Sequence, residues 1–269
     1  MTAQPDRAGP AAVITGGGTG IGAATARRLA ADGISVVLTG RRPEPITALA
    51  AELGDRAIAV AADAASAGDM ARAVAVAREN FGPVGILIAN AGGAGGGTAA
   101  DVADEAWAAA LQANLSTCLV SARACLPDLI ETSGVIVVVS SIAGLAASPE
   151  SVGYVTAKHG LIGLARSMAR DFGPRGVRVN VVCPGWVRTP MADEEMDQLM
   201  ELRSLVSREA AYELATAQVP LRRPASPEEV AAAIAFLAGP DASAITGAVL
   251  TVDCGATAVD LPTTAYDLA

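Results

Sequence analysis

The feature that most constrains the fold of this 269-residue chain is an alternation of short β-branched runs with longer alanine-rich segments of helical periodicity. The runs typical of strands are Ala11–Thr15, Ile34–Thr39, Ala57–Ala61, Val84–Ala89, Val135–Ser140, Val177–Val182 and Ala248–Val252. The helical segments are Gly20–Asp32, Pro43–Leu53, Ser66–Phe81, Asp104–Ile130, Val152–Phe172 and Ser226–Leu237. Such alternation predicts an α/β fold: a doubly wound parallel sheet of about seven strands with helices on both faces.

No repeat or break in composition divides the chain, so we expect a single domain over residues 11–256. Residues 1–10 are expected to be a flexible N-terminus and residues 257–269 a C-terminal tail. Residues 190–220, between the sixth strand and the last helix, are predicted to form a lid. Hydrophobic residues make up 52% of the chain, which is ample for one core at this length.

The net charge of −9 argues against a nucleic-acid-binding or anionic-membrane-binding surface. The N-terminus lacks the pattern of a signal peptide, and no apolar run reaches membrane length. The four cysteines, Cys118, Cys125, Cys183 and Cys254, form no Cys-x-x-Cys pair and no cluster with histidine. They indicate neither a disulfide framework nor a metal site, and we expect a cytoplasmic protein without a metal.

A glycine-rich turn follows the first predicted strand and opens a helix. Its residues are Thr15, Gly16, Gly17, Gly18, Thr19, Gly20, Ile21 and Gly22. Glycines here let the backbone approach a pyrophosphate, whose charge the helix N-terminus favours. The strand–turn–helix context therefore predicts a dinucleotide site, although a merely flexible turn is the alternative.

The ends of the second and third strands bear on the choice of cofactor. Arg41 and Arg42 follow Gly40, where an acid would exclude a ribose 2′-phosphate. Arginines there suit that phosphate, so NADP(H) is favoured and NAD(H) remains possible; solvated loop arginines are the alternative. Asp63, with the adjoining Ala64, could accept from an adenine amino group or could simply form a turn.

The fourth strand ends at Asn90, Ala91 and Gly92, where Asn90 could brace neighbouring backbone and Gly92 could admit a cofactor closely. Asn114 lies in an otherwise apolar helical stretch. A buried amide costs stability unless it is hydrogen-bonded, so Asn114 is either a structural link or part of a proton path.

The segment 151–158 contains Tyr154 and Lys158, which lie one helical turn apart. An unperturbed phenol has a pKa of about 10. A nearby ammonium is expected to lower this pKa and so make the phenol usable in proton transfer. The pair Ser140–Ser141 at the end of the fifth strand could add a hydroxyl. An ordinary amphipathic helix is the alternative for so short a motif.

Taken together in this order and spacing, these motifs resemble the short-chain dehydrogenase/reductase family, in its single-domain, 3-oxoacyl-reductase-like branch. The resemblance covers about residues 11–255 and implies a Rossmann-like fold that often assembles as a homotetramer or homodimer. It implies that Tyr154 is the general acid or base, that Lys158 lowers its pKa and contacts the nicotinamide ribose, and that Ser141 binds the substrate oxygen. Asn114 would hold a water connecting Lys158 to solvent.

The resemblance also assigns cofactor contacts to the end of the sixth strand, at Pro184, Gly185, Val187 and Thr189; Thr189 and the backbone near Val187 would hold the carboxamide. Two places depart from the family pattern. Ala89 stands where asparagine is common, and the stretch 252–255 reads Val-Asp-Cys-Gly instead of the usual Asp-Gly-Gly. The tail then continues past the usual end and could alter assembly or reach a neighbouring pocket.

The expected activity is hydride transfer between NADP(H) and a small ketone or secondary alcohol. The alternatives are an NAD(H)-dependent alcohol dehydrogenase and a non-enzymatic dinucleotide sensor. Trp186, Ile142 and the lid methionines favour an apolar or cyclic substrate. The lid begins with an acidic run over residues 193–197, which is typical of a solvated helix face; at the mouth of the site it would disfavour polyanions.

Overall fold

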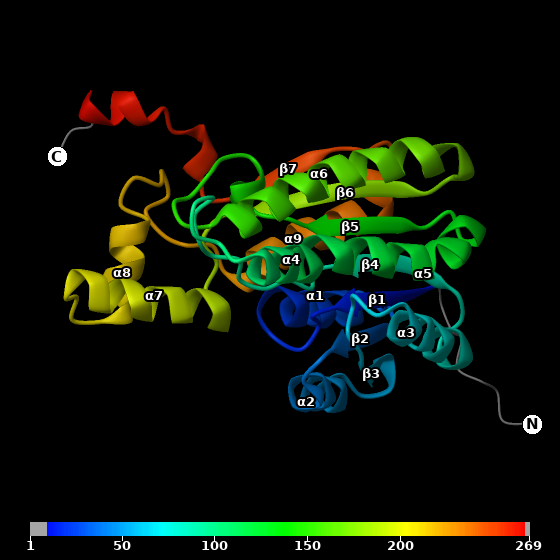
Figure 1. Ribbon diagram of the computed structural model, residues 1–269. Coiled ribbons are helices and arrows are strands. Elements are labelled where there is room, and N and C mark those ends of the chain that lie inside the picture. Colours follow the sequence, from blue (N-terminus) through cyan, green and yellow to red (C-terminus); the bar gives the residue numbers. More distant parts are fainter. Residues whose placement is uncertain (1–9, 267–269) are drawn as a thin grey trace, which may run out of the picture.

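Seven parallel strands form one sheet in the order β3-β2-β1-β4-β5-β6-β7, in a computed structural model that describes residues 10–266 (Figure 1). The strands are β1 (Ala11–Thr15), β2 (Val36–Gly40), β3 (Ala57–Ala61), β4 (Val84–Ala89), β5 (Val135–Val139), β6 (Arg178–Pro184) and β7 (Val249–Val252). Every residue of β1, β4 and β5 is buried, as expected for strands covered on both faces. The predicted fold class is confirmed.

Helices cover both faces of the sheet and form two cores with it. One core contains residues of α3 (Ala67–Asn80), α5 (Thr117–Glu131) and α6 (Val152–Phe172). The other contains residues of α1 (Gly20–Ala31), α2 (Pro43–Leu53) and α9 (Pro227–Ala238). The direction of winding reverses between β1 and β4, and ligands of such sheets bind at that point, outside the carboxyl ends of the strands.

One predicted helix is interrupted. The stretch expected as a single helix over Asp104–Ile130 consists of α4 (Asp104–Leu111), a π turn (Gln112–Ser116) and α5. The π turn contains Asn114, which is buried, and the Asn114 side-chain amide donates to the carbonyl of Ala110 at 3.1 Å. A π turn adds one residue to a helix and leaves the chain helical on both sides, so a continuous run of helix-forming residues does not reveal it.

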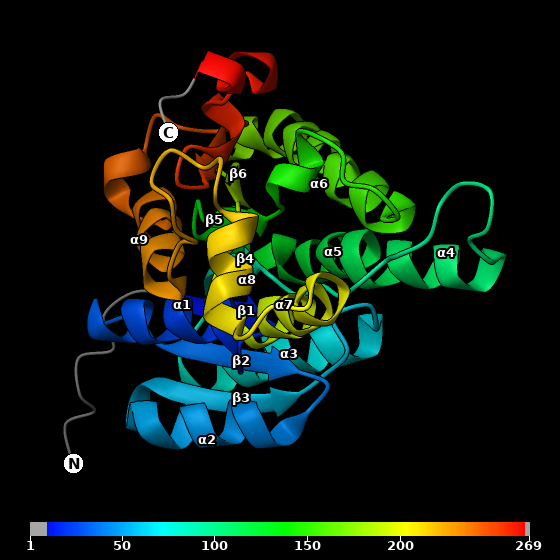
Figure 2. The ribbon, with the colours of Figure 1, turned by 90° about the vertical axis from the view of Figure 1, so that its left-hand side faces the viewer.

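Two helices lie outside the sheet layers, in the segment predicted as a lid. They are α7 (Pro190–Arg203) and α8 (Arg208–Ala215), and they lie across the carboxyl edge of the sheet (Figures 1 and 2). They share a small core of Ala192, Met196, Ala211 and Tyr212.

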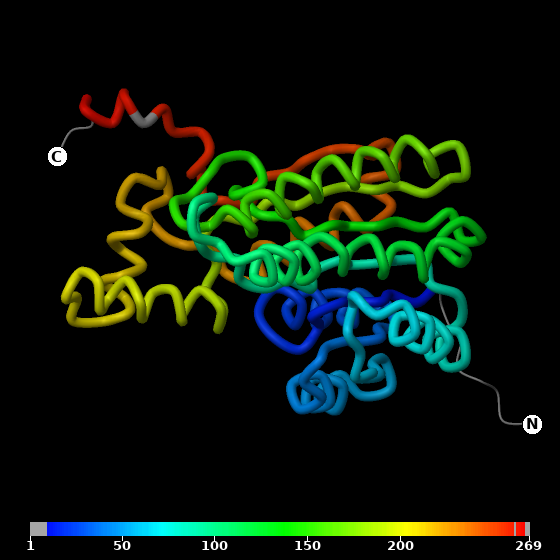
Figure 3. The backbone as a smooth tube through the Cα atoms, viewed as in Figure 1, coloured from blue at the N-terminus to red at the C-terminus, as the bar shows by residue number. Residues whose placement is uncertain are grey.

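The chain beyond β7 continues as short 3₁₀ segments that extend past the carboxyl edge (Figure 3). Residues 1–9 and 267–269 lie outside the described residues, so the predicted flexible N-terminus and the last part of the tail remain predictions. Within residues 10–266, no helix combines the length and apolar character needed to cross a membrane.

Candidate active site

The glycine-rich turn has a conformation and packing that require glycine. Gly16 has φ +62° and Gly20 has φ +52°, in the left-handed region that glycine tolerates. A Cβ placed on Gly22 would collide with the carbonyl oxygen of Gly16. The turn is therefore a tightly packed junction between β1 and α1, which contradicts the alternative of a merely flexible turn.

Thr15 and Asn90 tie this turn to the end of β4. The Asn90 side-chain amide donates to the carbonyls of Thr15 at 3.0 Å and Gly16 at 3.1 Å. In return the Thr15 hydroxyl accepts from the backbone N–H groups of Asn90 and Ala91, both at 3.0 Å. The bracing predicted for Asn90 is thus present, and it sits where the winding of the sheet reverses.

The start of α1 fits a phosphate group. Its N-cap residue, Thr19, makes no side-chain cap, and the first turn contains no acidic residue. The first N–H groups of a helix lack partners within the helix, and the helix dipole favours an anion at this end. Gly20 also lies against Thr189, since a Cβ on Gly20 would be 3.0 Å from Thr189 Cγ2. The turn and the end of β6 thus approach each other, as one dinucleotide spanning both would require.

The residues predicted to contact the adenosine end follow β2 and β3. Arg41 and Arg42 are exposed, and neither forms an ion pair with any described residue. Asp63 lies two residues beyond the end of β3, where its Oδ1 accepts from the N–H of Ala65 at 2.9 Å. Asp63 therefore does form a turn. Its contact with adenine stays a prediction, as does that of the buried Ala64.

Lys158 is a buried lysine in the middle of α6. Its Nζ donates to the carbonyl of Val139 at 3.2 Å and lies 5.4 Å from the ring centroid of Tyr154. Burial lowers the pKa of Lys158 to about 8, and Cys118 and Cys183 oppose this change. A buried lysine is costly, and such perturbed groups concentrate at functional sites.

The pKa of Tyr154 differs from the expectation. Burial of the phenol raises it, a hydrogen bond with Ser141 lowers it, and the negative charge of Glu195 raises it further. The net direction is upward, so the predicted lowering is wrong for this structure. The reason is that desolvation disfavours the phenolate and outweighs the hydrogen bond.

Asn114 contacts the loop that follows β4. Its Oδ1 accepts from the N–H of Gly93 at 3.0 Å. A Cβ on Gly92 would lie 3.0 Å from the same oxygen and 3.7 Å from Lys158 Nζ. Asn114 is therefore a structural link between the π turn and the β4 loop, and it also lies in the neighbourhood of Lys158. The two alternatives for this residue are both compatible with its position.

The four residues predicted at the end of β6 occupy that edge of the sheet. Pro184 ends the strand, and Gly185 donates its N–H to the carbonyl of Val252 at 3.1 Å. Val187 is buried and pairs with Ala225 in a short parallel bridge. Thr189 caps α7 by accepting from the N–H of Ala192 at 3.2 Å.

Two residues have positioning roles that the sequence did not indicate: Ser140 was named only with Ser141 as a possible source of a hydroxyl, and Gly95 was assigned no role. The Ser140 hydroxyl is buried and donates to the backbone carbonyl of Lys158 at 2.9 Å. Gly95 accepts from the N–H of Tyr154 at 3.1 Å, and a Cβ on Gly95 would be 2.7 Å from that nitrogen. The run of three glycines at residues 95–97 is the one sequence signal near this contact, and by itself it is typical only of a loop.

The expectation that the lid methionines line the substrate pocket is wrong for Met196. Met196 is 1% exposed and packs into the α7–α8 core, so it cannot line the pocket. Trp186 is partly buried and packs against the same core, whereas Met191 is exposed.

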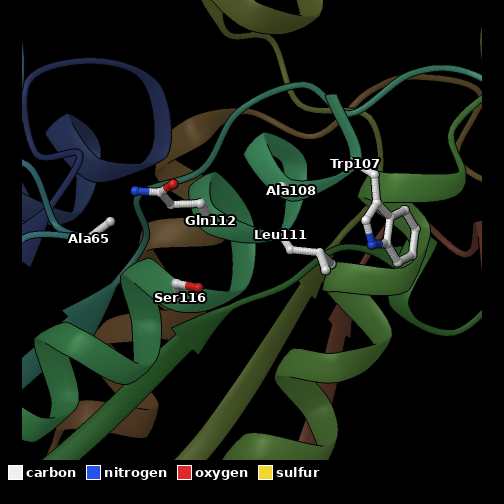
Figure 4. Close-up of a pocket in the computed structure, with 6 residues that line it drawn as sticks. All are labelled: Ala65, Trp107, Ala108, Leu111, Gln112 and Ser116. Atoms are coloured by element: carbon white, nitrogen blue, oxygen red, sulfur yellow. The ribbon is translucent and has the colours of Figure 1, made fainter. Parts of the chain in front are cut away.

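A separate hollow of about 520 Å³ lies along α4 and the π turn (Figure 4). Gln112 points toward Ala65 at one end, and Trp107 lies at the other. None of the predicted catalytic residues lines this hollow. It is distinct from the site around Tyr154.

Comparisons with known proteins show similarity over nearly the whole chain. The family model described as enoyl-(acyl carrier protein) reductase matches residues 16–257. Protein MoaE of Klebsiella aerogenes is 50% identical over 258 residues, covering 94% of this chain and 98% of that protein. Meso-2,3-butanediol dehydrogenase of Serratia marcescens is 36% identical, covering 92% of this chain and 94% of that protein. A crystallised variant of the actinorhodin polyketide ketoreductase with NADPH superimposes with a TM-score of 0.88 at 33% identity, covering 94% and 98% of the two chains.

The fold and these relatives define the class of protein as an NAD(P)-dependent oxidoreductase that acts on CH–OH groups. The chain belongs to the short-chain dehydrogenase/reductase family.

Proposed function

We propose that the protein is an NADP(H)-dependent reductase of a small apolar or cyclic ketone, with Tyr154 as its proton donor. The observation that carries the proposal is the meeting of Tyr154, Lys158 and Ser141 at the carboxyl edge of the sheet, beside the braced turn between β1 and β4. A phenol, a buried ammonium and a hydroxyl at one point suit a reaction in which charge develops on a carbonyl oxygen.

In this proposal Ser141 and Tyr154 both donate hydrogen bonds to the carbonyl oxygen of the substrate. A bound nicotinamide would supply the hydride to the carbonyl carbon in reduction and take it up in oxidation. Tyr154 gives its proton to the oxygen as the alcohol forms, and in oxidation it takes that proton back. Lys158, with a pKa of about 8, is mostly protonated at neutral pH and stabilises the phenolate left behind. Asn114 orders the path by which Tyr154 regains a proton.

The cofactor would lie along the carboxyl edge. The N–H groups at the start of α1 would hold the pyrophosphate, Asp63 the adenine, and Thr189 with the backbone near Val187 the carboxamide. Arg41 and Arg42 support NADP(H) over NAD(H), because both are exposed and free of ion pairs with the described residues. The structural relative crystallised with NADPH points the same way.

Parallel titrations of the purified protein with NADPH and NADH test the cofactor, and turnover of a panel of neutral ketones tests the reaction. We expect NADPH to bind more tightly and Arg41→Ser to reduce that preference by about tenfold, since a charged hydrogen bond to phosphate is lost. Glu44→Gln, a charge change of equal size in the adjacent helix, serves as the control. A preference for NADH would favour the alternative, an NAD(H)-dependent alcohol dehydrogenase. Binding of neither cofactor would contradict the proposal.

Assembly is part of the proposal. We expect a homotetramer or homodimer, which light scattering of the purified protein measures directly.

A further inference from the structure

The first turn of α6 packs against the end of α4 without space for a second methyl group between them. A Cβ placed on Gly153 would lie 2.7 Å from the Cβ of Ala110. Carbon atoms in van der Waals contact are about 3.5–4.0 Å apart, so such a Cβ would overlap by about 1 Å. Both residues are buried. The two helices therefore meet at this point through one methyl group, that of Ala110.

The loop after β4 meets the same methyl group. A Cβ on Gly95 would lie 2.9 Å from the Cβ of Ala110, and the Gly95 carbonyl accepts from the N–H of Tyr154 at 3.1 Å. The loop is also bonded to the chain that leads into α6, because the N–H of Gly97 donates to the carbonyl of Glu150 at 2.8 Å. Since the loop itself packs against Ala110, it cannot move aside to give the start of α6 more room.

A second contact holds α6 one turn further along. The Ser140 hydroxyl donates to the carbonyl of Lys158 at 2.9 Å, and Ser140 directly precedes Ser141. Lys158 and Ser141 are thus positioned from the end of β5, whereas Tyr154 is positioned from α4 and the loop after β4. A change at the contact between α4 and α6 therefore displaces Tyr154 relative to Ser141 and leaves the surroundings of Lys158 in place.

Ala110 also contacts the amide of the proposed proton path. Its carbonyl accepts from the side-chain amide of Asn114 at 3.1 Å. The Oδ1 atom of Asn114 in turn accepts from the N–H of Gly93, in the same loop that binds the N–H of Tyr154. One residue of α4 thus touches both the turn that bears Tyr154 and the side chain of Asn114.

We propose that the methyl group of Ala110 is a spacer that sets the position of Tyr154 relative to Ser141 and Asn114, so that Ala110 and Gly153 are positioning residues for the reaction. This rests on the proposed function, in which Tyr154 is the proton donor. The side chains at positions 110 and 153 together must amount to one methyl group. Reacting groups need to be held within about 0.5 Å of the productive geometry, and a displacement of about 1 Å can cost about a hundredfold in rate.

The test moves this methyl group from one helix to the other. Gly153→Ala adds a second methyl group, Ala110→Gly removes the first, and the double variant again has one. We expect kcat for a neutral ketone to fall by about tenfold to hundredfold in Gly153→Ala and to return to within about threefold of wild type in the double variant. KM and the Kd of NADPH should change by less than about twofold in both proteins.

The matched control is Gly163→Ala, which adds a methyl group to the same helix where nothing outside α6 lies within 4 Å of it. It should leave kcat unchanged. A merely structural contact would lower the Tm of Gly153→Ala and leave the kcat of the folded protein as in wild type, and that result would overturn the inference. A double variant as slow as Gly153→Ala would overturn it too.

If Gly153→Ala does not fold, Ala110→Gly decides, because it removes the spacer without creating an overlap. We expect this variant to lose about threefold in kcat at an unchanged Kd of NADPH, since the start of α6 is then held less precisely. An unchanged kcat in Ala110→Gly would contradict the proposal.

Failure of the proposed function looks different, because wild type itself would then turn over no ketone. In that case the position of Tyr154 is followed by NMR of ¹³C-labelled tyrosine, which the three tyrosines of this chain keep simple. Tyr154→Phe assigns the signal. We expect the signal to shift in Gly153→Ala and to return in the double variant. A signal that does not move in Gly153→Ala would overturn the inference without any measurement of turnover.

Discussion

The Ser140 hydroxyl donates a hydrogen bond of 2.9 Å to the backbone carbonyl of Lys158, and so joins the end of β5 to the middle of α6. Gly144, in the loop between them, packs against the same pair; a Cβ there would be 2.7 Å from Ser140 Oγ and 2.7 Å from the Lys158 oxygen. The end of the strand, the loop and the helix therefore meet around the Ser140 hydroxyl and the backbone of Gly144 and Lys158. This junction holds Ser141 beside Tyr154.

The two neighbouring serines should respond to substitution in opposite ways. Ser140→Ala removes a buried hydrogen bond, so we expect the free energy of unfolding to fall by about 1–2 kcal/mol while kcat changes only a few-fold. Ser141→Ala removes a donor to the substrate oxygen, so we expect kcat to fall by about 10²–10³ with a smaller loss of stability. Urea unfolding and steady-state kinetics on both variants measure the contrast. Equal losses of kcat would contradict it.

Tyr154→Phe should bind the cofactor normally and lose turnover, because the ring remains and only the transferable proton is removed. Loss of an acid–base group typically costs about 10²–10⁴ in rate. Tyr266→Phe, at a tyrosine that is 85% exposed, is the control and should keep full activity. Fluorescence titration with NADPH and ketone reduction assays give the two readouts. Full activity of Tyr154→Phe would refute the assignment.

Lys158→Met should stabilise the protein at neutral pH. The folded-state pKa of about 8 lies below the ordinary 10.5, so the unfolded chain binds the proton more tightly than the folded one. Burying the charged lysine therefore lowers the free energy of unfolding by its full amount below pH 8. This loss of stability disappears as the pH rises from 8 toward 10.5. The shift corresponds to roughly 3 kcal/mol, and the lost bond to Val139 offsets part of it.

We expect a net gain of about 2 kcal/mol for Lys158→Met near pH 7, with loss of activity. Urea unfolding of both proteins near pH 7 and near pH 10 measures how the gain depends on pH. A gain that grows with pH would mean that the burial of Lys158 has been misread.

Gly22→Ala should disrupt the turn between β1 and α1, because its methyl group would collide with the carbonyl of Gly16. We expect a loss of at least about 2 kcal/mol in the free energy of unfolding and weaker cofactor binding. Gly163→Ala is the matched control on a helix, since nothing outside α6 lies within 4 Å of the new methyl group. That variant should gain about 0.5–1 kcal/mol. Similar effects of the two substitutions on thermal unfolding would contradict the packing argument.

The strands were predictable from the sequence because they are short, continuous apolar runs rich in β-branched residues. Ala11–Thr15, Ala57–Ala61 and Val84–Ala89 have the predicted bounds. The π turn around Asn114 was not predictable, because it depends on contacts with Gly93 that lie far away in the chain.

The glycine-rich turn was predictable because its backbone conformation demands glycine, as at Gly16 with φ +62°, and Asn90 was predictable because it directly follows a buried strand. It was not predictable where burial or long-range pairing decides. The direction of the pKa change at Tyr154 depends on how deeply the ring is buried, and the ion pair between Asp197 and Arg208 joins two helices of the lid.

The lid has its own small core and its own ion pairs. In addition, the Arg188 guanidinium lies over the ring of Tyr212, with its central carbon 4.6 Å from the ring centroid. Because most of these contacts lie within the lid, we expect that its sequence can be exchanged without destabilising the sheet that positions the catalytic residues. We expect that replacing residues 188–216 with the equivalent segment of a relative, so that Arg188 moves with its partners Glu209 and Tyr212, would change the substrate preference and leave the sheet intact. The chain thus consists of two structurally separate parts: the sheet with the predicted catalytic residues, and the α7–α8 lid.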